Sequence, residues 1–203
     1  MSNEKYLVKH RIVISQFFMA VLGAVIISTT SWWEGSGLVG EALFSIGTVL
    51  VGIATVGRLW CSVYISGYKV KKLITTGPYS MCRNPLYFFS LLGSVGIGLA
   101  TETFVIPAVI AIAFALYYPY VISREEDRLA SVHSGDFENY CKKIPKFVPS
   151  FSLFEEPEEY KIKPRIFRKR LIDSLWFVWM LGIIEFIEAL HEYSYLPAFF
   201  KLY

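Results

Sequence analysis

Charge is scarce in this sequence. Charged residues make up 18% of its 203 positions, and the mean hydropathy is +0.45. A soluble domain carries about 25% charged residues, so this chain has too little charge to cover a fully hydrated surface. The scarcity excludes an ordinary water-soluble globular domain. The formal net charge is only +3, and we expect no nucleic-acid partner.

Cysteine is also rare. The chain has three, Cys61, Cys82 and Cys141, and their spacing fits neither disulfide pairs nor metal-ligand motifs. We therefore expect no disulfide framework and no metal site. A small-residue cleavage motif is lacking after the first apolar run. That run is expected to remain in the protein as a membrane span.

Apolar residues, in contrast, are abundant and gathered into long runs. They account for 54% of the chain, and a membrane-spanning helix needs about 20 of them in succession. The last run differs from the others because it contains three acidic residues. The runs predict an all-α integral membrane bundle of about five transmembrane helices: Ile12–Trp33, Leu38–Trp60, Leu86–Ala100, Phe104–Ile122 and Leu171–Leu190.

The basic residues indicate the orientation of this bundle. With the N-terminus in the cytoplasm, Lys201 is the one member of the 20 lysines and arginines that falls outside. Such asymmetry is typical of multi-pass membrane proteins. Two polar segments, Cys61–Pro85 and Ser123–Arg170, then lie in the cytoplasm, where a water-soluble cofactor can reach them. We expect a single membrane domain over residues 1–203, with two spans in 1–60, a core with a helical hairpin in 61–150 and a C-terminal extension in 151–203.

The first polar segment carries a dense motif before the third run. It reads Gly77-Pro-Tyr79-Ser-Met-Cys-Arg83-Asn84-Pro85-Leu-Tyr87. One interpretation is purely structural: Gly-Pro makes a turn, and Asn-Pro caps and begins a helix. That interpretation does not account for an arginine flanked by two tyrosines beside a helix N-terminus, where anions bind readily.

The second polar segment follows the fourth run. It contains Arg124-Glu125-Glu126-Asp127-Arg128-Leu129, then Phe137 and Tyr140, and ends on Lys146-Phe147-Val148-Pro149. Alone, it fits an ordinary juxtamembrane helix with charge pairs at helical spacing.

In this order and spacing, the two segments resemble the isoprenylcysteine carboxyl methyltransferase and phospholipid methyltransferase superfamily of membrane enzymes. The match covers roughly residues 40–150, and two motifs around one helical hairpin are more specific than either alone. The resemblance implies an S-adenosylmethionine site where both segments fold over the third and fourth spans. By match to the family pattern, the cofactor-binding residues are Leu73, Ile74, Tyr79, Asn84, Pro85, Tyr87 and Glu125.

The resemblance also implies methyl transfer to a lipophilic acceptor that enters from the lipid bilayer. We expect Glu125 to balance the cationic cofactor, and Arg83 or Arg124 to act as the catalytic residue that orients an anionic acceptor. His10, His133 and His191 lie outside both motifs. A carboxylate of isoprenylcysteine type is therefore favoured over a phospholipid amine, which needs a general base.

Two other interpretations stay open. One is an NADPH-dependent membrane reductase of the sterol type, and the other is a non-enzymatic scaffold with the same fold. Glu185, Glu188, His191 and Glu192 form a polar stripe in the fifth run. We interpret this stripe as a bundle-facing or interfacial surface. Gly93, Gly96 and Gly98 resemble a nucleotide-binding loop only superficially, because they lie inside the third run with no preceding strand. We interpret Ser90, Ser94 and Gly98, at four-residue spacing, as a helix-packing face.

Overall fold

A computed structural model describes residues 2–33, 37–66 and 72–201 of the chain. The protein is almost entirely helical, as predicted. Its helices are α1 (Ser2–Ser28), α2 (Leu38–Ile65), α3 (Pro78–Met81), α4 (Pro85–Leu99), α5 (Val105–Lys143), α6 (Pro164–Ser174) and α7 (Trp176–Glu192), with a 3₁₀ turn η1 at Phe151–Leu153 and two short parallel strands, β1 (Thr29–Thr30) and β2 (Phe200–Lys201).

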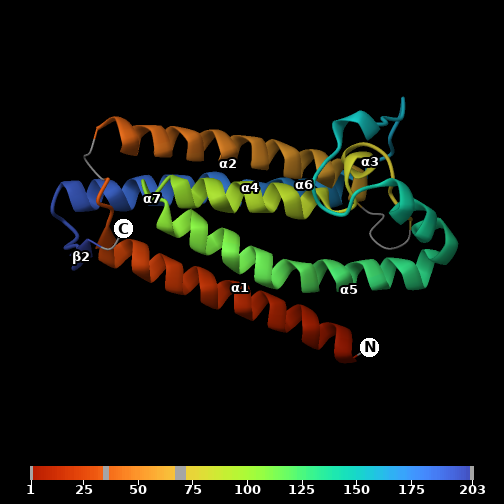
Figure 1. Cartoon of the computed structure of the whole chain (residues 1–203), viewed down its shortest axis with the longest axis horizontal. Helices are drawn as coiled ribbons and strands as arrows, with labels where there is room; N and C mark the ends of the chain where they lie inside the picture. Colours follow the sequence, from red (N-terminus) through yellow and green to blue (C-terminus); the bar gives the residue numbers. More distant parts are fainter. Residues whose placement is uncertain (1, 34–36, 67–71, 202–203) are drawn as a thin grey trace.

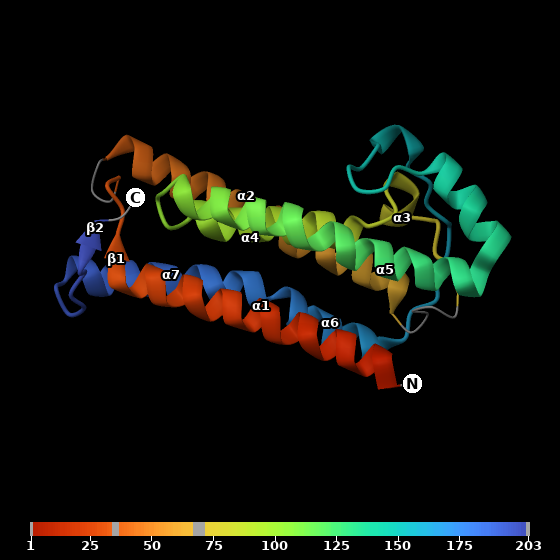
Figure 2. The same ribbon diagram turned by 60° about the horizontal axis from the view of Figure 1, so that its bottom comes forward.

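The long helices run lengthwise through an elongated bundle (Figure 1). α3, the C-terminal part of α5 and the chain that follows it gather at one end, and β2 lies at the other end. The same arrangement is visible after rotation (Figure 2). The strands β1 and β2 join the end of α1 to the C-terminal segment. Residues of the two predicted polar segments thus meet at one end of the molecule.

Glycines allow α2 and α4 to pack closely. A Cβ atom on Gly47 would lie 2.5 Å from the carbonyl oxygen of Gly96, and a Cβ on Gly96 would lie 2.7 Å from that of Gly47. On the same helix, a Cβ on Gly98 would lie 2.8 Å from Pro107 of α5. Such small-residue contacts are typical of helices in membranes. Of the predicted packing face, Gly98 makes such a contact, and its partner helix is α5.

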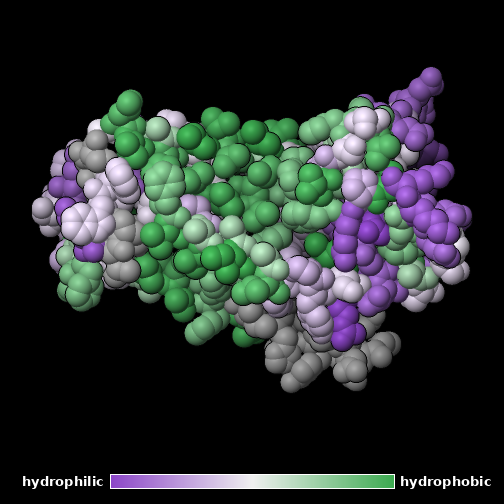
Figure 3. All heavy atoms as spheres, viewed as in Figure 1, coloured by the Kyte–Doolittle hydropathy of each residue, from purple (hydrophilic) through white to green (hydrophobic). Residues whose placement is uncertain are grey.

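Apolar residues cover the middle of one face of the bundle. Figure 3 shows hydrophobic residues across the central part and hydrophilic residues concentrated at the end that carries α3. Large apolar side chains there are exposed, including Val49, Val56, Ile112 and Leu116. Contiguous exposed apolar area of this kind marks a surface that contacts lipid or protein.

Two of the described helices, α2 and α5, are long and apolar enough to cross a membrane. Shorter apolar helical stretches occur at Gln16–Ser28 and Pro85–Leu99. The structure therefore supports a helical membrane-protein fold with two candidate spans. The five-span count and the cytoplasmic orientation remain predictions.

Several helix boundaries differ from the predicted runs. The first helix ends at Ser28, where the hydroxyls of Ser28 and Thr29 bond to carbonyls of the preceding turn. α5 continues beyond Ile122 to Lys143, with non-helical backbone angles at His133. The predicted fifth run is divided between α6 and α7, which adjoin at Leu175.

Candidate active site

Gly77 sets the conformation of the first motif. Its φ of +62° is a left-handed conformation that favours glycine, and a Cβ there would overlap the ring of Tyr64. Its backbone N–H donates to the carbonyl of Glu155 at 2.7 Å. Pro78 then occupies the first position of α3. The turn thereby attaches the first polar segment to the second one.

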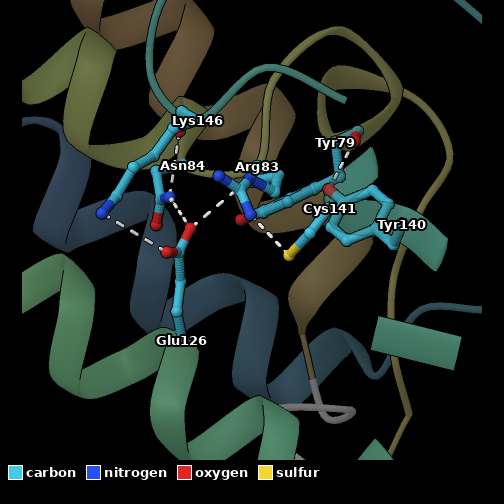
Figure 4. Close-up of polar contacts among 7 residues, drawn as sticks. All are labelled: Tyr79, Arg83, Asn84, Glu126, Tyr140, Cys141 and Lys146. Carbon is cyan, nitrogen blue, oxygen red and sulfur yellow. Dashed lines mark hydrogen bonds and ion pairs between the residues drawn. The ribbon is translucent and has the colours of Figure 1, made fainter. Parts of the chain in front are cut away.

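Asn84 precedes α4 at the N-cap position, and Pro85 is the first helical residue. The predicted capping bond of the Asn84 side chain is wrong, because that side chain makes no bond to the helix backbone. Its amide instead donates to Glu126 Oε1 at 3.1 Å and to the carbonyl of Lys146 at 3.0 Å (Figure 4). The amide of Asn84 therefore links the first motif to both parts of the second segment.

Glu126 is the centre of this network. Its carboxylate lies 3.5 Å from Arg83 Nε and 3.5 Å from Lys146 Nζ, in addition to the bond from Asn84 (Figure 4). The side chains of Glu126 and Arg83 are only 16% and 14% exposed. The Arg83 guanidinium also contacts the sulfur of Cys141. Glu126 thus holds the two polar segments together.

Beside this network is a cavity of about 450 Å³. Seven of the nine predicted site residues line it: Leu73, Ile74, Tyr79, Arg83, Asn84, Tyr87 and Glu125. Pro85 is buried at the start of α4. Arg124 does not line the cavity, because its guanidinium lies over the ring of Tyr120 on the same helix. The expected contribution of Arg124 to the site finds no support in this geometry.

Glu125 and Tyr87 form the polar wall of the cavity. The Tyr87 hydroxyl donates to Glu125 Oε2 at 2.7 Å. The ring of Tyr87 meets Tyr118 edge-on at 5.4 Å, and Tyr118 stacks on Phe114. Residues of α4 and its N-terminal flank, 38 to 43 positions before the glutamate pair, are thus brought to Glu125 or Glu126.

Tyrosine 79 lies against the C-terminal part of α5. Its carbonyl accepts a 2.6 Å hydrogen bond from the Tyr140 hydroxyl (Figure 4). Burial, together with nearby Cys61 and Glu125, raises the pKa of Tyr79 well above its usual range. The phenol therefore stays neutral at physiological pH and contributes a polar but uncharged wall.

Sequence reasoning missed several cavity residues, namely Gln16, Arg58, Ile65, Lys72, Leu86, Ser90, Tyr118, Leu129, Tyr140 and Arg170. Most lie inside apolar or basic runs, where nothing in the neighbouring sequence distinguishes a cavity residue from any other. Arg58 is the exception. An arginine near the end of a spanning run is a recognised indicator of a functional site, and the run itself could have identified it.

A second cavity of about 400 Å³ adjoins the first. Arg58, Ser90 and Tyr118 line both. The rest of its lining is mostly apolar and comes from α1, α4, α5 and α7, with Phe18, Leu22, Ile110, Phe177, Met180 and Ile184 among the residues. The first cavity, which contains Glu125 and Arg83, therefore adjoins a second cavity that is mostly apolar.

The polar stripe of the predicted fifth span lies at the other end of α7. The His191 ring nitrogen Nε2 lies 3.0 Å from the carbonyl oxygen of Ile27. Glu188 and His191 line two hollows there, of about 10 and about 600 Å³, with Thr30, Ser31 and Glu102. Within residues 2–33, 37–66 and 72–201, no three His, Cys, Asp or Glu side chains are grouped so as to hold a metal ion.

Comparison with known proteins identifies the family. The model of the phospholipid methyltransferase family matches residues 20–135, more than half of the chain. This protein belongs to the phospholipid methyltransferase family. The matched residues include α2, α4, the glutamate pair and most of α5. The resemblance stated from the two motifs is confirmed, and the helices α6 and α7 lie beyond the matched region.

Three relatives extend this finding. The chain is 41% identical to the nickel-cobalt-cadmium resistance protein NccN of Alcaligenes xylosoxydans xylosoxydans, over 98% of this chain and 92% of that protein. It is 38% identical to the cobalt-zinc-cadmium resistance protein CzcN of Cupriavidus metallidurans, over 96% and 89%. It is 29% identical to protein-S-isoprenylcysteine O-methyltransferase B of Arabidopsis thaliana, over 58% and 60%. No solved structure matches the chain.

Proposed function

We propose that this protein is an S-adenosylmethionine-dependent membrane methyltransferase that methylates a lipophilic acceptor, a carboxylate of isoprenylcysteine type. The observation that carries the proposal is that residues of both motifs line the same cavity. Residues chosen from two motifs about 40 positions apart lie around one cavity, and Glu125 and Tyr87 meet there at 2.7 Å. The family to which the chain belongs supports methyl transfer in general.

The cavity fits the cofactor in size and in chemistry. Its volume of about 450 Å³ is in the range of about 300–1,000 Å³ found for small-molecule sites. Glu125 offers a carboxylate for the cationic cofactor, and Tyr79, Tyr87 and Tyr118 offer aromatic faces, to which cations are attracted. Leu73 and Ile74 add apolar lining, and Asn84 adds a carbonyl oxygen.

In the proposed reaction these residues would hold the cofactor and the acceptor in position, and they would not need to transfer a proton. Bound there, the cofactor supplies a methyl group on a sulfonium, and transfer to a carboxylate breaks the sulfur–methyl bond and forms an oxygen–methyl bond, with a neutral thioether and an ester as products. Holding two reactants in line can supply about 7–11 kcal/mol of a barrier. The tyrosines around Glu125 would exclude water, and the network of Glu126 would keep both polar segments in place.

The adjoining apolar cavity is the proposed acceptor chamber. A hydrocarbon chain fits a chamber lined by side chains such as Leu22, Ile110 and Met180. No histidine is among the described residues that line either cavity. A protonated amine acceptor would require a base, and Glu125 already accepts a bond from Tyr87. This arrangement favours a carboxylate acceptor over a phospholipid amine.

We also propose that this methylation serves resistance to nickel, cobalt, zinc or cadmium, because relatives that cover nearly the whole chain are named for such resistance. Deletion of the gene should lower growth on the metal, and the wild-type gene should restore growth. Rescue by the Glu125→Gln variant to the same level would show that catalysis is not what confers resistance.

Thermal unfolding of detergent-purified protein separates the competing functions. S-adenosylhomocysteine should raise the unfolding temperature, because a ligand that binds the folded state stabilises it by mass action. Stabilisation by NADPH instead would indicate a reductase, and a response to neither would favour a scaffold. Glu138→Gln, which changes an exposed carboxylate paired with Lys142, is a matched control that should respond like the wild type.

A further inference from the structure

Arg58 of α2 lies where the two cavities meet. It lines the polar cavity together with Glu125 and Tyr87, and it lines the apolar cavity together with Phe177 and Met180. It lies within a long apolar helix. A cation in such a position is costly unless a partner compensates its charge.

The contacts of Arg58 fix its orientation and leave part of its charge uncompensated. One terminal nitrogen donates to the hydroxyl of Ser90, and the guanidinium lies 5.3 Å from the centre of the Phe177 ring. Its buried Nε atom has no hydrogen-bond partner among the described residues. Neither Ser90 nor Phe177 carries a negative charge, so the guanidinium is held in place with a donor free.

The neighbouring charges do not complete this site. Asp173 lines the apolar cavity, but its carboxylate lies 3.5 Å from Arg170, and both side chains are nearly half exposed. Arg170 itself lines the polar cavity. The carboxylate of Asp173 is therefore engaged at the rim, whereas Arg58 presents a fixed cation where the two chambers join.

We propose that Arg58 binds the anionic head group of the acceptor, with the acceptor's hydrocarbon in the apolar cavity; this inference rests on the proposed function and names the residue that selects an anion. Ser90 and Phe177 are positioning residues that act through Arg58. Because Phe177, Met180 and Ile184 lie beyond the family match of residues 20–135, helix α7 adapts the acceptor site in this chain.

Binding of a simple lipophilic anion tests the proposal without catalysis. Tritiated palmitate is the probe, with unlabelled palmitate and its neutral methyl ester as competitors, measured on the full chain in a non-ionic detergent. The wild type should bind palmitate saturably and prefer it to the ester by about tenfold or more, as a hydrogen bond to a charged group predicts. Arg58→Met should lose this preference, and Arg58→Lys should retain part of it, because lysine keeps the charge without the planar fork.

Arg165→Met is the matched control, because Arg165 of α6 is exposed and lines neither cavity. It should bind palmitate like the wild type. Gel filtration and thermal unfolding show whether each variant is folded, and only folded variants are compared. If folded Arg58→Met retains the preference for the acid, the proposal is overturned.

Binding of S-adenosylhomocysteine, measured in parallel, distinguishes this proposal from the proposed function. Its affinity should be within about twofold in Arg58→Met. A loss of S-adenosylhomocysteine binding with palmitate binding intact would assign Arg58 to the cofactor's own carboxylate and overturn the proposal. Failure of the wild type to bind S-adenosylhomocysteine, with palmitate binding still dependent on Arg58, would overturn the proposed function and leave the anion site standing.

Discussion

At the scale of single residues, two adjacent glutamates have different contacts. Glu125 faces the cavity and accepts from Tyr87. Glu126 faces the protein and binds Arg83, Asn84 and Lys146. The family resemblance assigned Glu125 to the cofactor, but local sequence gives no role to Glu126, because successive helical residues differ only in direction, and direction depends on how the helix packs.

Replacement of Glu126 by Gln should therefore destabilise the fold. The change weakens charge-assisted contacts of the largely buried Glu126 to the largely buried Arg83 and to the exposed Lys146, and should lower the free energy of unfolding by about 1–3 kcal/mol. The unfolding temperature in detergent measures this loss. An unfolding temperature equal to that of the wild type would contradict the assigned role, and Glu138→Gln provides the control for an exposed carboxylate.

Cys82 makes stability depend on pH in the alkaline range. Burial raises the pKa of its thiol from about 9 to about 12. Between those values the folded state keeps a proton that the unfolded state loses, so stability should fall as pH rises, by up to about 1.4 kcal/mol per pH unit. Unfolding temperatures from pH 8 to pH 11 should fall less steeply in Cys82→Ala. Parallel curves for the two proteins would be evidence against this assignment.

At the scale of helices, the positions of the apolar runs predicted where most of the long helices lie. Leu38, at the start of a run, begins α2, and Pro85, after Asn84, begins α4. The continuation of α5 to Lys143 was not predictable, because a polar helical surface has no apolar periodicity of its own. The division between α6 and α7 at Leu175 was not predictable either, because the predicted apolar run continues through it.

The candidate site was predictable to a similar degree. Motif residues such as Tyr87 and Glu125 were identified because family spacing places them together. Tyr118 and Ser90 were not, because each is one small or aromatic residue within an apolar run. Arg124 does not line the cavity, since a helix presents adjacent residues in different directions and Tyr120 holds its side chain on the surface.

Filling the apolar cavity from α1 should block the acceptor and spare the cofactor. Gly23 lines this cavity, and a Cβ there would meet no atom within 4 Å. Gly23→Leu should therefore fold and weaken palmitate binding about tenfold, with S-adenosylhomocysteine affinity unchanged. Gly52→Leu is the matched control, since Gly52 is equally open and lines neither cavity. Equal palmitate affinities in the two variants would place the acceptor elsewhere.

At the scale of the whole molecule, the account requires both polar segments on the cytoplasmic face. Figure 3 shows hydrophilic residues concentrated at the end that carries α3, and the cytoplasmic location of that end is a prediction. Glu138→Cys and Tyr195→Cys introduce exposed thiols on α5 and beyond α7. An impermeant maleimide applied to the outside of intact cells should label the second and not the first. Labelling of both from one side would contradict the five-span topology.

The central claim is that the two polar segments form a cofactor site around Glu125. Calorimetric titration of the purified protein with S-adenosylhomocysteine tests it most directly. The wild type should bind one equivalent, Glu138→Gln should bind like the wild type, and Glu125→Gln should lose binding while its unfolding temperature stays near that of the wild type. Equal affinity in Glu125→Gln and the wild type would contradict the account.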